Sequence, residues 1–142
     1  ISGIIWFCLN DYRTQMGEEG EGRLRRRVHG SADLYGNPKP SYETVKRECA
    51  PLYISSINAV NTDEKTSGVE IVIANKNALP CYEAKGYHLA GFDGAGCLIS
   101  YTTLEPLKPG ETQKIFLADA QSQLARIAIQ RPNGAESISY FI

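Results

Sequence analysis

The feature that most constrains the fold is a change of pattern at Pro51, after which apolar residues recur at alternate positions in short segments. About seven such segments follow in about ninety residues, with turn signals roughly every 8 to 12 residues. Consecutive hairpins with no helix between them cannot build a parallel sheet. Residues 51–142 are therefore predicted to form an immunoglobulin-like antiparallel β-sandwich, and the chain to be mainly β.

Individual segments indicate which side chains face the core. The segment GVEIVIANKN places Val69, Ile71 and Ile73 on one face, and the end of the chain predicts a hairpin that turns at Pro132-Asn133-Gly134. Ile54 and Ile57 are further candidates for inward positions. The predicted hairpin has Leu124, Ile127 and Ile129 before its turn and Ile138, Tyr140 and Ile142 after it.

The first fifty residues follow a different pattern. The run from Ile4 to Leu9 is apolar, and the polar segment Asn10–Arg13 follows it. Such a run is typical of a strand buried on both faces of a parallel sheet. A long polar loop comes next, then a short helix over Tyr42–Cys49 with Ser41 as its N-cap. Residues 1–50 are thus expected to form the last strand-loop-helix unit of a (β/α)₈ barrel, a fold of about 250 residues.

Bulk composition excludes some classes of function. The 142 residues carry a formal net charge of −1, so no nucleic-acid partner is indicated. No apolar run approaches the roughly 20 residues that span a membrane, so no membrane partner is expected. The chain starts at Ile1 without a basic leader, which suggests a trimmed piece of a longer protein. The compartment stays open between periplasmic or secreted and cytoplasmic.

The cysteines do not indicate a metal site. Cys8, Cys49, Cys81 and Cys97 form no CxxC pair, and neither histidine lies near them in sequence. We therefore expect no metal and no cofactor. Disulfides stay open, while Cys8 in an apolar strand is expected to be a small buried hydrophobe.

Two sequence elements resemble one enzyme family. The stretch GIIWFCLNDYRT, then Gly36-Asn37-Pro38-Lys39-Pro40-Ser41-Tyr42, then a sandwich, resembles the C-terminal part of family-two glycoside hydrolases. That family includes β-galactosidases, β-glucuronidases and β-mannosidases. The resemblance is specific from Gly3 to about Arg47 and looser over the sandwich. It implies that Gly3–Thr14 holds the eighth strand of a catalytic barrel and that Ser41 lies at the start of the last barrel helix.

The family hydrolyses a terminal β-linked sugar with retention, and its two catalytic glutamates both precede the eighth strand. The resemblance therefore implies that both lie upstream of Ile1. Glu18, Glu19 and Glu21 lie in a glycine-rich segment and are expected to be a solvated charge run rather than an acid pair tuned by burial. The chain alone is predicted to be inactive and to contain no catalytic residue.

Two residues are candidates for substrate binding. The resemblance implies that Trp6 contributes to the wall of the sugar subsite in the parent enzyme, although a core tryptophan would give the same pattern. Asp11 is the second candidate, because it can orient a sugar hydroxyl or hold the loop through backbone hydrogen bonds. We favour the structural role for Asp11.

The segment RLRRRVHGSADLYG bears on the sugar. β-Glucuronidases of this family have an Asn-x-Lys pair there, which receives the sugar carboxylate, and the segment RLRRRVHGSADLYG of this chain lacks it. The resemblance therefore implies a neutral sugar, with galactose the default. The basic cluster Arg23–Arg27 is expected to pair with nearby glutamates, since no aromatic residues interleave it. His29 is expected to be an ordinary loop residue.

A second class of function stays open. The chain is alternatively a non-catalytic β-sandwich module that binds carbohydrate or protein, in which Tyr82, Tyr87, Phe92 and Tyr101 form a platform. Aromatic residues in alternating strands more often pack the core, and we favour that interpretation here. The expected partners are a β-linked sugar and the rest of the barrel in the parent enzyme, and a second copy that pairs through the apolar N-terminal strand.

Overall fold

The computed structural model describes residues 8–14, 25–61, 67–118 and 123–142. The chain divides into two compact units, Ile1–Glu48 and Cys49–Ile142. Within the described residues no helix is long and apolar enough to cross a membrane.

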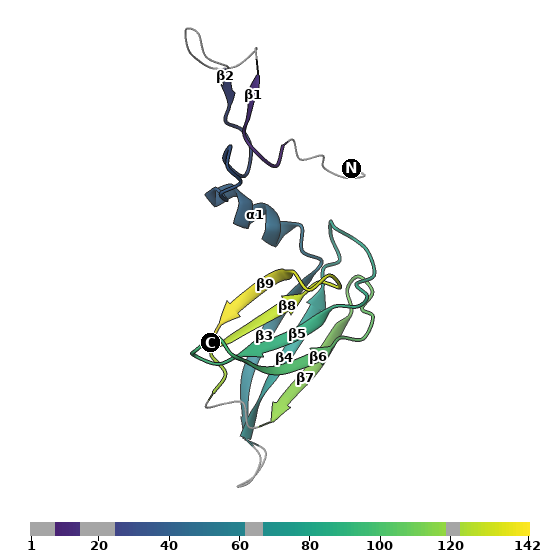
Figure 1. Cartoon of the computed structure of the whole chain (residues 1–142). Helices are drawn as coiled ribbons and strands as arrows, with labels where there is room; N and C mark the ends of the chain where they lie inside the picture. The colour runs from purple at the N-terminus through teal and green to yellow at the C-terminus, as the bar shows by residue number, and fades with distance from the viewer. Residues whose placement is uncertain (1–7, 15–24, 62–66, 119–122) are drawn as a thin grey trace. The chain divides into compact units, whose positions relative to one another are not determined.

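The first unit contains a hairpin and a helix. Strands β1 (Tyr12–Thr14) and β2 (Arg25–Arg27) pair antiparallel, with Tyr12 opposite Arg27 (Figure 1). Helix α1 spans Pro40–Glu48 and has Glu43 in its first turn and two basic residues in its last turn. These charges complement the helix dipole.

The polar residues Asn10–Thr14 were expected to end the first strand, and Tyr12–Thr14 do form a strand. The prediction of a long polar loop after them is wrong where β2 forms. Backbone pairing needs no apolar side chain, and Tyr and Thr both favour strands. The expected strand from Ile4 to Leu9 lies mostly outside the described residues. Of its described members, Cys8 and Leu9 are in no strand, Cys8 is only half-buried, and the Leu9 side chain is 61% exposed.

The helix begins two residues before the expected start. Pro40 occupies its first turn, where a proline loses no hydrogen bond because that N–H would have no helical acceptor. Ser41 is therefore inside the helix rather than at its N-cap. The helix ends at Glu48, and Pro51 follows three residues later.

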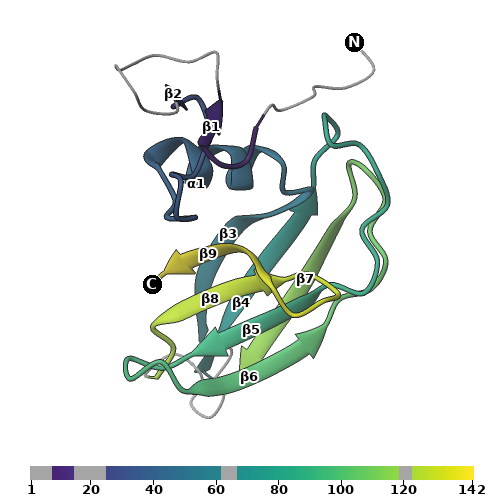
Figure 2. The same ribbon diagram turned by 45° about the horizontal axis from the view of Figure 1, so that its top comes forward.

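The second unit contains two antiparallel sheets, and the prediction of a mainly β fold is confirmed (Figures 1 and 2). One sheet has three strands in the order β3-β4-β7, and the other has four in the order β6-β5-β8-β9. The strands are β3 (Leu52–Asn61), β4 (Ser67–Asn75), β5 (His88–Phe92), β6 (Leu98–Thr103), β7 (Thr112–Ala118), β8 (Arg126–Gln130) and β9 (Glu136–Phe141).

Side chains from both sheets enclose one hydrophobic core, an arrangement consistent with a β-sandwich. Val69, Ile71 and Ile73 are buried as predicted. Ile54 and Ile57 both contact this core although they lie three positions apart. A bulge between Ile54 and Ser56 accounts for this, because one extra residue restores the inward side of the pleat.

The terminal hairpin forms as predicted, with Gly134 at φ 81° in its turn. Ile127 and Ile129 are fully buried, and Ile138 and Tyr140 pack against the core. Ile142 does not follow the pattern, since its side chain is 57% exposed just past the end of β9.

Asn75, at the end of β4, holds two loops in place. Its side chain is buried, and Nδ2 donates to the carbonyl oxygens of Tyr82, at 2.9 Å, and of Leu107, at 2.7 Å. Its backbone N–H donates to Glu111 O at 3.0 Å. The amide therefore gives Tyr82 O a donor and gives Leu107 O a second one, beside the Ala84 N–H at 2.9 Å.

We expect Asn75→Ala to lower the free energy of unfolding by roughly 1–3 kcal/mol, because Tyr82 O loses the Asn75 donor whereas Leu107 O keeps the Ala84 N–H. Asn77→Ala is the matched control, because Asn77 is exposed, and should change stability by less than about 0.5 kcal/mol. Urea unfolding of both variants measures the difference. Equal effects would contradict the role given to the Asn75 amide.

Candidate functional site

Three backbone segments lie side by side in the first unit. The Asp11 N–H donates to Ala32 O at 2.8 Å, and the Ala32 N–H donates to Leu9 O at 2.7 Å. On the other side, the Lys39 N–H donates to Ser31 O at 2.9 Å. This arrangement brings the segment after the apolar run next to the segment that precedes α1.

The Asp11 carboxylate is held at the centre of this arrangement. Lys39 Nζ lies 2.6 Å from Asp11 Oδ1, and the Gly30 N–H donates to the same oxygen at 2.9 Å. Lys39 Nζ also donates to Val28 O at 2.8 Å. The Asp11 side chain is 8% exposed and that of Lys39 is 28% exposed. We call the interaction of these two side chains the Asp11–Lys39 clasp.

Gly30 makes the clasp sterically feasible. A Cβ atom at this position would lie 2.4 Å from both Asn10 C and Asp11 N, closer than any real contact. A side chain there would push the backbone of residue 30 away from Asp11 and remove its N–H from the carboxylate.

Asp33 closes a tight turn next to the clasp. Its Oδ1 accepts hydrogen bonds from the Tyr35 and Asn37 N–H groups, both at 2.8 Å, and its Oδ2 accepts one from Asn37 Nδ2 at 2.8 Å. The side-chain hydrogen bond from Asn37, followed by the backbone bonds, lowers the pKa of Asp33. The carboxylate is therefore kept ionised, which suits a turn and opposes a role as general acid.

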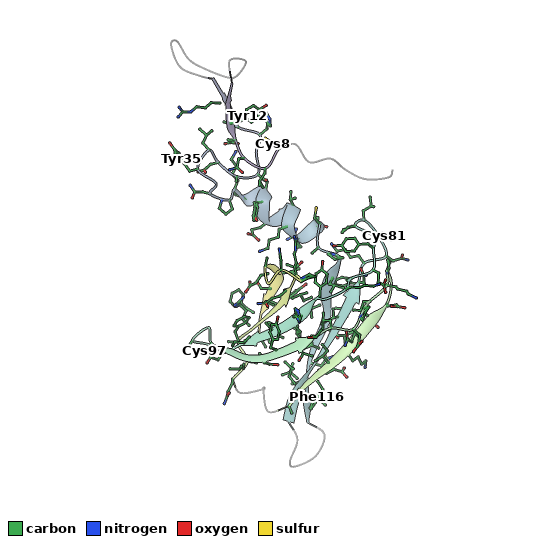
Figure 3. The ribbon with its side chains drawn as sticks, turned by 45° about the vertical axis from the view of Figure 1, so that its right-hand side comes forward. Cys8, Tyr12, Tyr35, Cys81, Cys97 and Phe116 are labelled. Atoms are coloured by element: carbon green, nitrogen blue, oxygen red, sulfur yellow. The ribbon has the colours of Figure 1, made fainter. Side chains whose placement is uncertain are left out.

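A small surface pocket of about 170 Å³ opens between these elements, lined by Asp11, Val28, Asp33, Leu34 and Tyr35. The Tyr35 side chain is 83% exposed and that of Val28 is 54% exposed. Figure 3 shows Tyr35 on its loop and Tyr12 on the hairpin. An aromatic ring beside carboxylate oxygens can contact the C–H face of a sugar and accept hydrogen bonds from its hydroxyls.

The predicted site residues have different outcomes. Trp6 lies outside the described residues, as do Glu18, Glu19 and Glu21, and no side chain of the cluster Arg23–Arg27 is described. The Asp11 carboxylate accepts hydrogen bonds from Lys39 Nζ and the Gly30 N–H, and its part in substrate binding stays a prediction. The His29 ring meets the Tyr12 ring edge-on, with centroids 5.6 Å apart.

The aromatic residues of the sandwich do not all pack the core. Tyr87 is buried, but Tyr82 is 46% exposed and Tyr101 is 51% exposed, so the expectation of core packing is wrong for these two. Tyr101 stacks on His88 with ring centroids 4.9 Å apart. Phe92 lies under the Arg126 guanidinium, 4.0 Å from ring centroid to Cζ, a cation–π contact.

Tyr87 has a perturbed hydroxyl. Burial, together with a hydrogen bond to the Tyr82 hydroxyl at 3.2 Å, raises the pKa of Tyr87 to about 12. Burial disfavours the phenolate, so Tyr87 stays neutral at physiological pH and acts as a hydrogen-bonding core residue rather than a base.

All four cysteines are free thiols. Cys8, whose thiol donates to Asn10 O at 3.0 Å, is half-buried, and the other three are exposed. Among the residues that the structure describes, no three histidine, cysteine, aspartate or glutamate side chains gather in a way that could hold a metal ion.

Neither a family model nor a curated protein matches the sequence. Among solved structures, a penta-heme cytochrome c552 from Thermochromatium tepidum is similar, with a TM-score of 0.40 and 9% sequence identity. The similarity covers 76% of this chain and 43% of the cytochrome chain, so this chain spans less than half of that protein's length. A TM-score this low carries no argument about fold or function.

Lys39 is the partner of Asp11 that was not predicted from the sequence. It lies between Pro38 and Pro40, and such a position holds the chain extended ahead of the helix. A lysine fixed in this way, with a lone aspartate at the end of an apolar run, is a signal for an ion pair. The partner can be named only once the fold brings the two segments together.

We expect the clasp to be worth about 1–3 kcal/mol, because it is a charge-assisted hydrogen bond with a buried carboxylate. A double-mutant cycle with Asp11→Asn and Lys39→Met measures it, with hydrogen exchange at the Gly30 and Ala32 amides as the readout. The control cycle uses Glu43 and Lys46, a pair 3.9 Å apart whose carboxylate side chain is 67% exposed, which should give less than about 0.5 kcal/mol. Coupling no larger than the control would refute the clasp.

A carboxyl NMR titration should give Asp33 a midpoint below the ordinary value of 3.8, with the Asn37 side chain as the largest cause. Because the folded pKa is lower than the unfolded one, the stability that these bonds provide is present above about 3.8 and lost as pH falls through the folded value. Asn37→Ala should move the midpoint toward 3.8. Tyr35→Phe keeps the backbone donor and should leave the midpoint in place.

Proposed function

We propose that this chain is the C-terminal piece of a retaining β-glycosidase resembling the family-two β-galactosidases, which hydrolyses terminal non-reducing β-linked sugars. In the parent enzyme the piece completes the (β/α)₈ barrel and supplies a supporting immunoglobulin-like sandwich. The observation that carries this proposal is the Asp11–Lys39 clasp, at 2.6 Å.

The clasp joins the two sequence elements on which the resemblance rests. Asp11 belongs to the Trp…Asp-Tyr element, and Lys39 belongs to Gly-Asn-Pro-Lys-Pro-Ser-Tyr, 28 positions further on. A match of two sequence elements does not by itself imply that the elements contact each other in the folded chain. Their direct contact supports the interpretation that they form one functional unit.

The surroundings of Asp11 and Asp33 are consistent with catalytic carboxylates that lie in another part of the parent enzyme. Retaining hydrolysis needs two carboxyl groups about 5–5.5 Å apart, one a nucleophile and one an acid with a raised pKa. Asp11 is engaged by Lys39 and Gly30, and Asp33 is held ionised in its turn. Neither suits the acid role, which agrees with the family's two glutamates lying upstream of Ile1.

The order of strands supports the immunoglobulin-like assignment. Counted from β3, one sheet holds the first, second and fifth strands, and the other holds the third, sixth and seventh together with the fourth. Immunoglobulin constant domains divide their seven strands in the same way, except that the fourth joins the first sheet. Here β6 pairs with β5 instead.

Within this proposal Trp6 contacts the apolar face of the sugar, and Asp11 positions the loop beneath it. The sugar is neutral, with galactose the default, because the segment RLRRRVHGSADLYG has no Asn-x-Lys pair to receive a carboxylate. The parent enzyme is therefore a glycoside hydrolase, and this piece alone is inactive.

One observation favours a second candidate, a non-catalytic module that binds carbohydrate. Tyr101, stacked on His88, leaves half of its side chain exposed on a sheet surface. An exposed ring braced by a second ring can serve as a flat platform for a sugar. This candidate differs from the first in requiring Tyr101 and not Trp6.

Assays of the isolated chain and of the parent protein on nitrophenyl β-glycosides test the proposal. We expect turnover by the parent, none by the chain, and a fall in kcat/KM of about tenfold or more for Trp6→Ala in the parent, equivalent to at least about 1.4 kcal/mol of lost transition-state stabilisation. Tyr101→Ala is the control and should leave kcat/KM unchanged.

Hydrolysis by the isolated chain would contradict the position given to the catalytic glutamates. Calorimetric binding of galactose or an oligosaccharide by the isolated chain, abolished by Tyr101→Ala and unaffected by Trp6→Ala, would instead support the binding module.

A further inference from the structure

Strand β6 is an edge strand without charge. It spans Leu98–Thr103, with the sequence LISYTT, and within the described parts of the chain it pairs only with β5. Figure 2 shows it at the border of its sheet. Leu98, Ile99 and Tyr101 are 55%, 39% and 51% exposed. Edge strands that remain unpaired usually carry lysine, proline or a central bulge that discourages pairing.

The register determines which backbone groups of β6 face outward. Leu104 N–H donates to Tyr87 O at 2.9 Å, and residues 87 and 104 continue the pairing of His88 with Thr103. Because hydrogen-bonded pairs alternate in an antiparallel ladder, Ser100 and Thr102 also bond to β5. The N–H and C=O groups of Tyr101 and Thr103 therefore point away from the sheet.

The other three edges are protected in ways that β6 is not. β7 carries Lys114 and β9 carries Glu136. β3 has no charged residue, but it is bulged at Ser55, and its Ile54 N–H donates to Tyr140 Oη at 3.4 Å. The bulge of β6 lies at Ile99, next to its start, and leaves the run from Ser100 onward regular.

We propose that β6 pairs antiparallel with β6 of a second copy of this chain, about a two-fold axis at Thr102. This register places Tyr101 opposite Thr103 of the other copy, and the converse, so that the outward groups form four backbone hydrogen bonds. An axis at Tyr101 would instead place Thr103 opposite the bulge at Ile99 and lose two of these bonds.

A second copy fits this edge because the edge is complementary to itself. Two-fold antiparallel pairing brings identical strands together, which brings like charges together wherever a strand carries charge. LISYTT has none, so no charge repulsion within β6 opposes the pairing. The pairing also sets Thr102 beside Thr102 of the other copy, and it covers part of each exposed Tyr101 ring on the outer face. The two four-stranded sheets would become one continuous sheet.

Thr103→Pro in the full chain tests this pairing. The substitution removes an outward N–H without removing a backbone hydrogen bond to β5, although it also removes the Thr103 hydroxyl, which lies 3.2 Å from His88 Nδ1. Proline is tolerated at such edge positions. The control is Thr112→Pro at the edge of β7. The Thr112 N–H also points away from its neighbour, because Asn75 N–H bonds to Glu111 O in the adjacent pair. Sedimentation equilibrium over a concentration series measures the dissociation constant, and urea unfolding checks that both variants fold.

We expect wild type to dimerise, Thr103→Pro to raise the dissociation constant about tenfold or more, and Thr112→Pro to leave it unchanged. Hydrogen exchange provides a readout that needs no variant: the Tyr101 and Thr103 amides should gain protection as protein concentration rises, while those of Ser100 and Thr102 stay protected throughout. A monomer at all concentrations would overturn the proposal. So would a dimer lost in Ile5→Lys but kept in Thr103→Pro, or protection of Tyr101 and Thr103 that does not depend on concentration.

Discussion

Burial of alternating aliphatic side chains between two sheets is the interaction on which the second unit depends. Ile71, Ile73, Leu89, Ile127 and Ile129 are all at most 1% exposed, and they come from strands of both sheets. Each fully buried side chain of this size contributes about 1.5–3 kcal/mol. A one-residue slip of register would turn a whole set of them toward water, so the core fixes the register of every strand. The outward position of Tyr101 and the open groups of β6 follow from that register.

The first unit is organised on a different principle. Its helix has no buried residue, and few of its described apolar side chains are buried. Order comes instead from polar contacts: the backbone bonds of Ala32 with Leu9 and Asp11, the Asp11–Lys39 clasp, and the turn that Asp33 closes. Each such hydrogen bond adds little net stability, but a buried polar group that lacks its partner destabilises the fold. A piece held together in this way is suited to complete a larger structure, as the proposed function requires.

The sequence predicts the second unit well and the first unit poorly, for a physical reason. The period of two in β4 and the Pro132-Asn133-Gly134 turn are local signals, and they give the strands and the hairpin directly. The β1–β2 pairing and the Asp11–Lys39 contact join residues far apart in the chain through polar groups that leave no periodic pattern. Tyr101 was wrongly assigned to the core because alternation defines the two faces of a strand without showing which face is buried. An aromatic residue is compatible with either face.

The bulges show how local departures from the pattern determine what each edge can do. In β3 the bulge lies inside the strand, where it lets Ile54 and Ile57 both reach the core, while Tyr140 from β9 satisfies the outward Ile54 N–H. In β6 the bulge lies at Ile99, one residue from the start, so the rest of the edge keeps the regular spacing that another strand requires. The fourth strand of this sandwich pairs with the third rather than the fifth, which leaves it at the border of the larger sheet. The strand order and the position of one extra residue together make β6 the edge best suited to pairing.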